Sequence, residues 1–351
     1  MIRFLSVAIL LIITWSCSQN STKPAAVAFH NINSKYNAIW QADQLLKTLQ
    51  LQFKNERVEN YANDLPILLP VDSTFGITHK LDIGNLIRKA SLVIDRHQNS
   101  KFVDDAYLLI AQGRYLQGDF KNTIETLKYI NTLDPDKKTQ GQTLTLLYQV
   151  YLLSDDFDAA EMTEEFILEN KLESWEYSLA KAFEHQKKGQ IKASITLLNQ
   201  MVGDAKNRQD RSRLYYILGQ MYERSNQASL AQRAYQNSAR QKSNYELTLR
   251  ANIANKALEK SIPALEKLLL DPKNEDQKSE IYVALGKIYL QDNDLTKAKN
   301  AWQQATKNNP NRGELYFQLG NLYANQMQDY PRAAAYFDSA ATNLSLSLIH
   351  I

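Results

Sequence analysis

The sequence predicts an all-α fold in which antiparallel helix pairs stack into a solenoid behind an N-terminal helical segment. Three observations support this prediction. Leucine, alanine and tyrosine recur at helical spacing along the 351 residues, and 19 of these are tyrosine. The 11 glycines and 8 prolines are too few for the turns of an all-β fold with many short strands. A Leu-Gly-x-x-Tyr pattern also recurs, and two of its copies are separated by about one 34-residue repeat.

The charge balance and the cysteine content exclude several classes of function. The chain has 41 lysines and arginines against 38 aspartates and glutamates, which gives a net charge of +3. A nucleic-acid-binding protein would carry a basic stripe and a much higher isoelectric point, so we expect no nucleic-acid partner. The single cysteine, Cys17, excludes an intramolecular disulfide and a cysteine-rich metal site.

Residues 1–16 have the layout of a signal peptide. A positive start is followed by an apolar run that is shorter than the about 20 residues of a membrane span. The residues before Cys17 resemble a bacterial lipobox, because small Ser16 precedes the cysteine that would be lipidated, although Trp15 is bulkier than usual. Residues 17–28 are then expected to form a flexible tether between the lipid and the folded protein.

An N-terminal helical segment is expected over residues 29–102. Its first helix should begin at about Ser34, which can cap it, and end before a proline-bounded loop at residues 65–72. The expected apolar face of this helix comprises Tyr36, Ile39, Trp40, Leu45, Leu46, Leu49 and Phe53. A second helix is expected from about Leu81 to His97, and its apolar face comprises Ile83, Leu86, Ile87, Ala90, Val93 and Ile94.

Residues 103–342 carry a repeat of about 34 residues. The clearest copy contains Leu285, Gly286, Tyr289, Ala298, Trp302 and Pro310. The next copy contains Leu319, Gly320, Tyr323, Ala333 and Phe337, and an earlier one contains Leu218, Gly219, Tyr222, Ala231 and Tyr235. These residue types at these spacings indicate tetratricopeptide repeats. Weaker copies extend the array to about seven helix pairs, and a degenerate one has a short second helix that starts at Pro263.

Each position of the repeat pattern has a physical reason. The small residues are expected where the two helices of a pair cross too closely for a larger side chain, and they include Gly219, Gly286, Gly320 and Ala298. The large residues are expected to fill the space between one pair and the next, and they are Tyr289, Trp302, Tyr323 and Phe337. Pro310 should end the second helix of its pair.

Several stretches around the start of the repeats resemble one bacterial family. They are residues 29–31, 34–37, 89–94, 99–110 and 118–120. The most specific part is Asp104-Asp105-Ala106-Tyr107, which generic repeats do not require. Together these stretches resemble the PorW/SprE-type tetratricopeptide lipoproteins of Bacteroidetes. The resemblance implies a component of the type IX protein secretion system and of the gliding motility machinery.

The last residues, 343–351, look foreign to the array. They end in a short apolar run, whereas a solenoid normally ends in a polar capping helix. Members of the resembled family are also considerably longer than this chain. We therefore expect a truncated sequence whose last few residues are a sequencing artefact. The alternative is a genuine apolar tail that caps the last helix pair.

The chain has no motif for catalysis or for cofactor or metal binding. No two of its five histidines stand at metal-ligand spacing, and there is neither a phosphate-cradling glycine loop nor a G-x-S-x-G motif. We therefore expect no enzyme activity, no cofactor, no metal and no small-molecule substrate. A solenoid instead offers a concave groove, lined mainly by the first helices of successive pairs, that suits an extended peptide or a partner helix. Candidate groove residues are Tyr107, Arg114, Gln149, Glu184, Gln220, Arg224, Lys287, Gln291, Asn321 and Asn325.

The sequence therefore predicts a scaffold that binds other proteins, which the resemblance identifies as secretion or gliding subunits. It is expected on the periplasmic side of the outer membrane and to touch the membrane only through a lipid on Cys17. Two alternatives stay open. One is a general periplasmic adaptor for envelope assembly or peptidoglycan enzymes. The other is the N-terminal part of a longer protein whose catalytic domain lies beyond residue 351.

Overall fold

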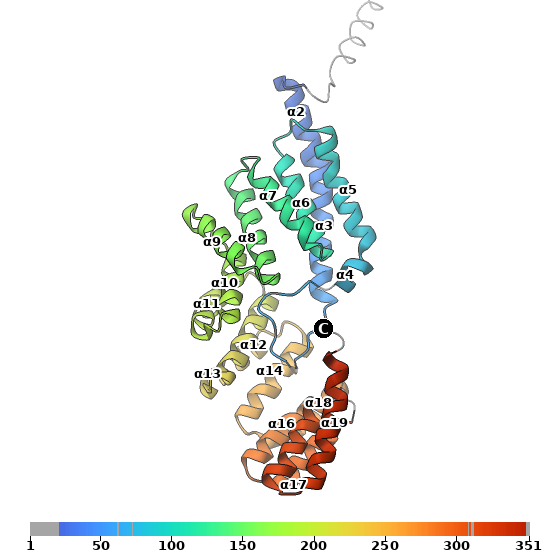
Figure 1. Cartoon of the computed structure of the whole chain (residues 1–351), viewed down its shortest axis with the longest axis vertical. Coiled ribbons are helices and arrows are strands. Elements are labelled where there is room, and N and C mark those ends of the chain that lie inside the picture. The colour runs from blue at the N-terminus through green and yellow to red at the C-terminus, as the bar shows by residue number, and fades with distance from the viewer. Residues whose placement is uncertain (1–20, 62, 72, 308, 310–311, 349–351) are drawn as a thin grey trace, which may run out of the picture. The chain divides into compact units, whose positions relative to one another are not determined.

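The computed structural model describes residues 21–61, 63–71, 73–307, 309 and 312–348, and the side chains of all of these except residues 73 and 344–348. The expected signal peptide, Cys17, Pro310 and residues 349–351 lie outside the described residues. Every regular element in the described part is a helix, which confirms the all-α prediction (Figure 1). The chain divides into two compact units. Unit 1 comprises residues up to 59 and residues 66–194, and unit 2 comprises residues 60–65 and those from 195 onward.

Unit 1 begins with one uninterrupted helical run. This run consists of α2 (Pro24–Asn33), the π-helical η1 (Ser34–Ile39) and α3 (Trp40–Asn55). The structure corrects two predictions here. Residues 24–28 are helical and so are not part of a flexible tether, because Pro24 occupies the first turn, where its missing N–H costs nothing. Ser34 lies buried inside the run and makes no capping hydrogen bond.

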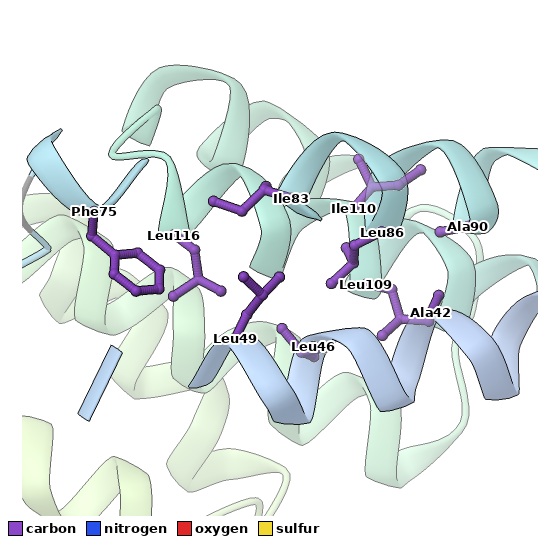
Figure 2. Packing of buried hydrophobic residues seen from close by; sticks show 10 residues of the cluster. All are labelled: Ala42, Leu46, Leu49, Phe75, Ile83, Leu86, Ala90, Leu109, Ile110 and Leu116. Carbon is purple, nitrogen blue, oxygen red and sulfur yellow. The ribbon is translucent and has the colours of Figure 1, made fainter. Parts of the chain in front are cut away.

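The core of the N-terminal segment lies between α3, α4 (Ser73–Thr78), α5 (Lys80–Arg96) and α6 (Val103–Leu116) (Figure 2). Its buried residues are Ala42, Leu46, Leu49, Phe75, Ile83, Leu86, Ala90, Leu109, Ile110 and Leu116. The predicted second helix is confirmed as α5. Tyr36 and Trp40 are instead 63% and 57% exposed. At about 100° per residue, Trp40 lies on the opposite side of the helix from buried Ala42.

The helix pairs of unit 1 begin with α6 and α7 (Phe120–Asn131). They continue with α8 (Lys137–Leu153) and α9 (Phe157–Glu169), and then with α10 (Trp175–Lys187) and α11 (Ile191–Asp204), whose residues from 195 onward belong to unit 2. Three aspartates are the N-caps of helices in this series. Their carboxylates accept hydrogen bonds from backbone N–H groups of the first turn. They are Asp119, Asp136 and Asp156.

Unit 2 continues the series of helix pairs. Its helices are α12 (Arg208–Arg224), α13 (Ala228–Arg240), α14 (Tyr245–Leu258), α15 (Ile262–Leu270), the 3-10 helix η2 (Pro272–Gln277), α16 (Lys278–Gln291), α17 (Leu295–Ala305), α18 (Arg312–Asn321), the π-helical η3 (Leu322–Gln326) and α19 (Tyr330–Leu348). Pro263 stands in the first turn of the short α15, as predicted. The helix α19 continues beyond Asn343, where the sequence predicted that the array would stop.

The turn inside each helix pair has the same backbone conformation. One residue in each turn has a positive φ, between 52° and 75°, which reverses the chain between the two helices. These residues are Gly118, Asp155, Gly189, Asn226, Lys260, Asn293 and Gln328. Their spacing of 33 to 37 residues shows that seven helix pairs of one design follow one another in the described residues.

Close crossing of the two helices explains the repeat glycines. A Cβ at Gly219 would lie 2.5 Å from the ring of Tyr235, and one at Gly320 would lie 2.6 Å from the ring of Phe337. Gly286 likewise lies directly against the indole of Trp302. The predicted reason for these glycines is therefore confirmed. The aromatic partner belongs to the second helix of the same pair, so Trp302 and Phe337 pack within their own pairs, whereas the prediction placed them in the space between pairs.

Other repeat residues do connect successive pairs. Trp302 of α17 also packs in a buried cluster with Leu315 and Leu319 of the following helix α18. The hydroxyl of Tyr222 accepts a hydrogen bond of 2.7 Å from the side chain of Asn199 on α11. Tyr289 packs partly buried against the core shared by α14, α15 and α16, as predicted. Tyr323 stacks on Tyr336 at 5.3 Å, within its own pair.

Replacing Gly286 by alanine should destabilise unit 2. The added methyl group would overlap the indole of Trp302, and such overpacking costs about 1–3 kcal/mol. The same change at Gly203, a helical glycine of unit 2 with no atom within 4 Å of the new methyl, should leave the stability unchanged or raise it slightly. Urea unfolding of both variants measures the difference. Equal unfolding midpoints would contradict the packing described here.

Candidate partner-binding surfaces

Unit 1 has a cavity of about 370 Å³ between α5, α6 and α7. Its lining consists of Ser91, Ile94, Asp95, Tyr107, Ile110, Arg114, Glu125, Thr126 and Tyr129. Two predicted groove residues, Tyr107 and Arg114, therefore line the same cavity. They stand seven residues apart on α6, which places them on one face of that helix, two turns apart.

An aromatic pair and a fixed cation form the wall of this cavity. The rings of Tyr107 and Tyr129 meet edge to face, with centroids 4.9 Å apart. Burial, the neighbouring Tyr129 and the charge of Asp95 raise the pKa of the Tyr107 hydroxyl above its ordinary value of 10. Arg114 donates to the hydroxyl of Thr126 and is thereby held against α7. The cavity thus offers both apolar and charged contacts to a bound segment.

In unit 2, three side chains on α12 face a non-helical piece of the chain. We call residues 60–65 the inserted segment, of which residue 62 lies outside the described part. The side chains that contact it are spaced by four residues on α12, and they are Tyr216, Gln220 and Arg224.

The contacts of the inserted segment involve its main chain and its side chains. Gln220 accepts a hydrogen bond of 2.9 Å from the N–H of Leu65 and donates one of 3.0 Å to the C=O of Asn63. Arg224 forms an ion pair of 2.8 Å with Asp64. Two of the predicted groove residues, Gln220 and Arg224, are therefore brought together on one occupied surface.

Tyr216 and Arg250 also contact the inserted segment, and the sequence analysis missed both. The ring of Tyr61 meets that of Tyr216 edge to face at 5.4 Å, and the guanidinium of Arg250 lies 5.2 Å from the centre of the Tyr61 ring. The position of Tyr216, one turn before Gln220, was a signal that could have identified it. No local pattern marks Arg250, because it lies on the next first helix, α14.

The prediction that Glu184 lines the groove is wrong. Its side chain is only 1% exposed and does not line an accessible groove. Its carboxylate accepts hydrogen bonds from Tyr148 at 2.7 Å and from Lys181 at 2.6 Å, and it pairs with Lys188 at 2.7 Å. Lys181 also binds Glu164. These cations and the hydroxyl draw the carboxylate inward. Burial alone would raise the pKa of Glu184, but its hydrogen bonds outweigh burial and lower the pKa to about 2.

The other predicted groove residues remain predictions. Gln149 is half-buried and donates a hydrogen bond to the main-chain oxygen of Glu176. The exposed ones are Lys287, Gln291 and Asn325, while Asn321 at the end of α18 is half-buried. None of them lies against the inserted segment in the contacts described above.

The structure brings together two histidines that are far apart in the sequence. The Nδ1 atoms of His30 and His97 are 2.8 Å apart. Burial, the neighbouring His30 and the charge of Arg96 lower the pKa of His97. Within the described ranges, no group of three or more histidine, cysteine, aspartate or glutamate side chains could hold a metal ion. No helix in that part of the chain has the length and apolar character needed to cross a bilayer.

Comparisons with known proteins agree with the repeat architecture. No family model matches the chain, and no curated protein matches it. The chain is similar to the solved structure of the C-terminal part of a TPR repeat-containing protein from Cytophaga hutchinsonii, with 15% identity, a TM-score of 0.48, and coverage of 70% of this chain and 98% of that one. It is also similar to the APC/C hetero-tetramer Cut9–Hcn1, with 14% identity, a TM-score of 0.41, and coverage of 93% and 60%.

A third similar structure is the P58(IPK) TPR domain, with 16% identity, a TM-score of 0.27, and coverage of 92% of this chain and 99% of that one. With identities and TM-scores this low, the repeat assignment rests on the helix pairs, their common turn and the glycine contacts. On those grounds the fold is an all-α tetratricopeptide-type solenoid, the architecture of a protein-interaction scaffold.

Replacing Glu184 by glutamine should lower the free energy of unfolding of unit 1 at pH 7 by about 1.5–3 kcal/mol, because it weakens hydrogen bonds to a charged, buried group. The pKa of Glu184 is about 2 in the folded chain, below its ordinary value of 4.5. The ionised carboxylate therefore stabilises the fold above pH 4.5, and this contribution is lost as the pH falls towards 2.

The difference between the wild type and Glu184→Gln should accordingly shrink on acidification, as measured by thermal unfolding between pH 7 and pH 3. Glu165→Gln, a change of the same kind at an exposed position of α9, is the matched control and should have little effect. A Glu184→Gln variant that unfolds like this control at pH 7 would show that the buried network does not stabilise unit 1.

Proposed function

We propose that this protein is a lipid-anchored scaffold whose first-helix surfaces bind non-helical segments of other proteins. One observation carries the binding part of the proposal. The carboxamide of Gln220 contacts the C=O of Asn63 and the N–H of Leu65, as a peptide group of a neighbouring strand would. Such a contact holds a chain through its main chain, which is how extended peptides are recognised in many complexes.

The proposed setting is the type IX secretion and gliding machinery. The support for it is the sequence resemblance in residues 29–130. Two of the resembling stretches also pack against each other in unit 1. Asn31 accepts hydrogen bonds from the hydroxyl of Ser100 and from the N–H of Lys101. Two stretches that carry the resemblance, residues 29–31 and 99–110, therefore contact each other. Residues 29–31 and 99–110 are therefore parts of one local structure in unit 1.

The proposed anchor is a lipid on Cys17, at the periplasmic side of the outer membrane. The first helix of unit 1 begins at Pro24, so six residues, 18–23, separate the cysteine from it. Six residues reach at most about 20 Å when extended. A lipid at Cys17 would therefore hold unit 1 close to the membrane surface, where it would meet partners from the same membrane.

The anchor predicts the behaviour of Cys17→Ser. This variant should not incorporate labelled palmitate and should move from the membrane fraction to the soluble periplasmic fraction, because serine lacks the thiol that is acylated. Radiolabelling and fractionation of cells that produce either form measure both effects. Acyl labelling of the Cys17→Ser chain, or its unchanged sedimentation with membranes, would refute the anchor.

The proposed secretion function and the proposed role of the α12 surface together predict the outcome of complementation in cells. Deletion of the gene should reduce export of type IX cargo, and the wild-type gene should restore it. Arg224→Glu should restore export only in part, because it reverses the charge that pairs with Asp64. Arg233→Glu makes the same change at an exposed position on the second helix α13 and should restore export.

Secreted cargo in the culture medium is the measurement. Normal export by the deletion strain would remove the secretion function and favour a general periplasmic adaptor. Full restoration by Arg224→Glu would show that export does not use the α12 surface.

A further inference from the structure

The inserted segment belongs to a different unit from its neighbours in the sequence. Residues 60–65 lie in the sequence between helices of unit 1, yet they belong to unit 2. They contain one turn, with a hydrogen bond of 3.3 Å from the N–H of Asn63 to the C=O of Asn60, and no regular secondary structure follows it. They add no helix to the repeat series of unit 2. Their contacts are those of a bound peptide.

The surface that holds this segment is also fixed by unit 2 itself. Arg250 is only 12% exposed and forms ion pairs with Glu280 at 2.6 Å and with Glu246 at 3.3 Å. The ring of Tyr216 packs against that of Tyr235, with centroids 5.3 Å apart. Both residues that hold Tyr61 are therefore positioned by neighbours in α13, α14 and α16. These contacts within unit 2 favour a surface that is preorganised for its occupant.

The contacts define which side chains this surface accepts. Tyr61 lies against an aromatic ring and a guanidinium, a pair that favours an aromatic occupant. Three residues later, Asp64 meets Arg224, and the next residue, Leu65, is only 1% exposed. Gln220 forms hydrogen bonds with the main chain at Asn63 and Leu65. The described contacts therefore define tyrosine at the first position, aspartate at the fourth and leucine at the fifth.

The ion pair at one end of the segment is a weak restraint. The side chain of Arg224 is 71% exposed, and exposed pairs contribute at most about 1 kcal/mol. Burial raises the pKa of Asp64, the charge of Arg224 only partly offsets this, and Glu223 raises it further. The bound state of this end is open to exchange.

We propose that the α12–α14 surface of unit 2 is a recognition site for a partner segment of the pattern Tyr-x-x-Asp-Leu, and that residues 60–65 occupy the site until such a segment displaces them. The inference rests on the proposed protein-binding function and names the chemistry of the partner. Because the inserted segment is part of the same chain, its effective concentration at the site is on the order of millimolar. A partner segment binds only if its own effective concentration or affinity is high enough to displace the inserted segment. This limits binding to partners that are held nearby or that also bind at a second surface.

A synthetic peptide of residues 58–67 tests this inference. Fluorescence anisotropy measures its binding to the purified wild-type chain and to the double variant Tyr61→Ala/Asp64→Ala, which weakens the internal occupant and leaves the surface intact. The peptide should bind the double variant at least about ten-fold more tightly than the wild type. A peptide with alanine at the positions of Tyr61 and Asp64 should not bind either protein.

A charge exchange distinguishes recognition from nonspecific binding. Arg224→Glu in the double-variant background should lose affinity for the peptide, and a peptide with arginine in place of Asp64 should regain it. Arg233→Glu in the same background is the control and should bind the original peptide normally. Circular dichroism and thermal unfolding confirm that each variant is folded.

Three results would overturn the inference. They are the absence of peptide binding to a folded Tyr61→Ala/Asp64→Ala chain, equal affinity for this variant and the wild type, and binding that is insensitive to Arg224→Glu. None of them bears on cargo export by the deletion strain, so the proposed secretion function stands or fails separately.

Discussion

The close crossing of the two helices in a pair is the constraint on which the rest of the structure depends. At Gly219, Gly286 and Gly320 an aromatic ring of the second helix occupies the place of a first-helix side chain. This contact fixes which face of the first helix turns towards its partner. Side chains on the adjacent face of that helix then form a binding surface. On α12 those side chains follow a four-residue spacing, so Tyr216, Gln220 and Arg224 contact one short segment.

Whether a polar side chain on a first helix serves packing or binding depends on its position relative to the turn of its pair. Glu184 is surrounded by Lys181, Lys188 and the hydroxyl of Tyr148, so it is buried and stabilises unit 1. Gln220 on α12 lies six residues before the turn residue Asn226, whereas Glu184 on α10 lies five residues before Gly189. The carboxamide of Gln220 contacts the main chain of the inserted segment. One helical residue, about 100° around the axis, therefore separates a packing position from a contact position.

The sequence predicted what local spacing determines. The glycine positions and the apolar face of α5 follow from helical periodicity, and both are found in the structure. Local sequence patterns could not predict contacts between residues that are far apart in the chain. The pairing of His30 with His97 and the docking of Asp64 on Arg224 depend on tertiary structure that no local pattern records. The predicted tether, residues 17–28, extends too far along the chain, because a helix begins at Pro24.

The central claim is that the first-helix surface of unit 2 holds a chain segment through its main chain. Amide hydrogen exchange at Leu65 tests this most directly, because the N–H of Leu65 donates to Gln220. This amide should exchange slowly in the wild type and much faster in Gln220→Ala, while the amides of α12 keep their protection. An unchanged exchange rate of the Leu65 amide in Gln220→Ala would contradict the account.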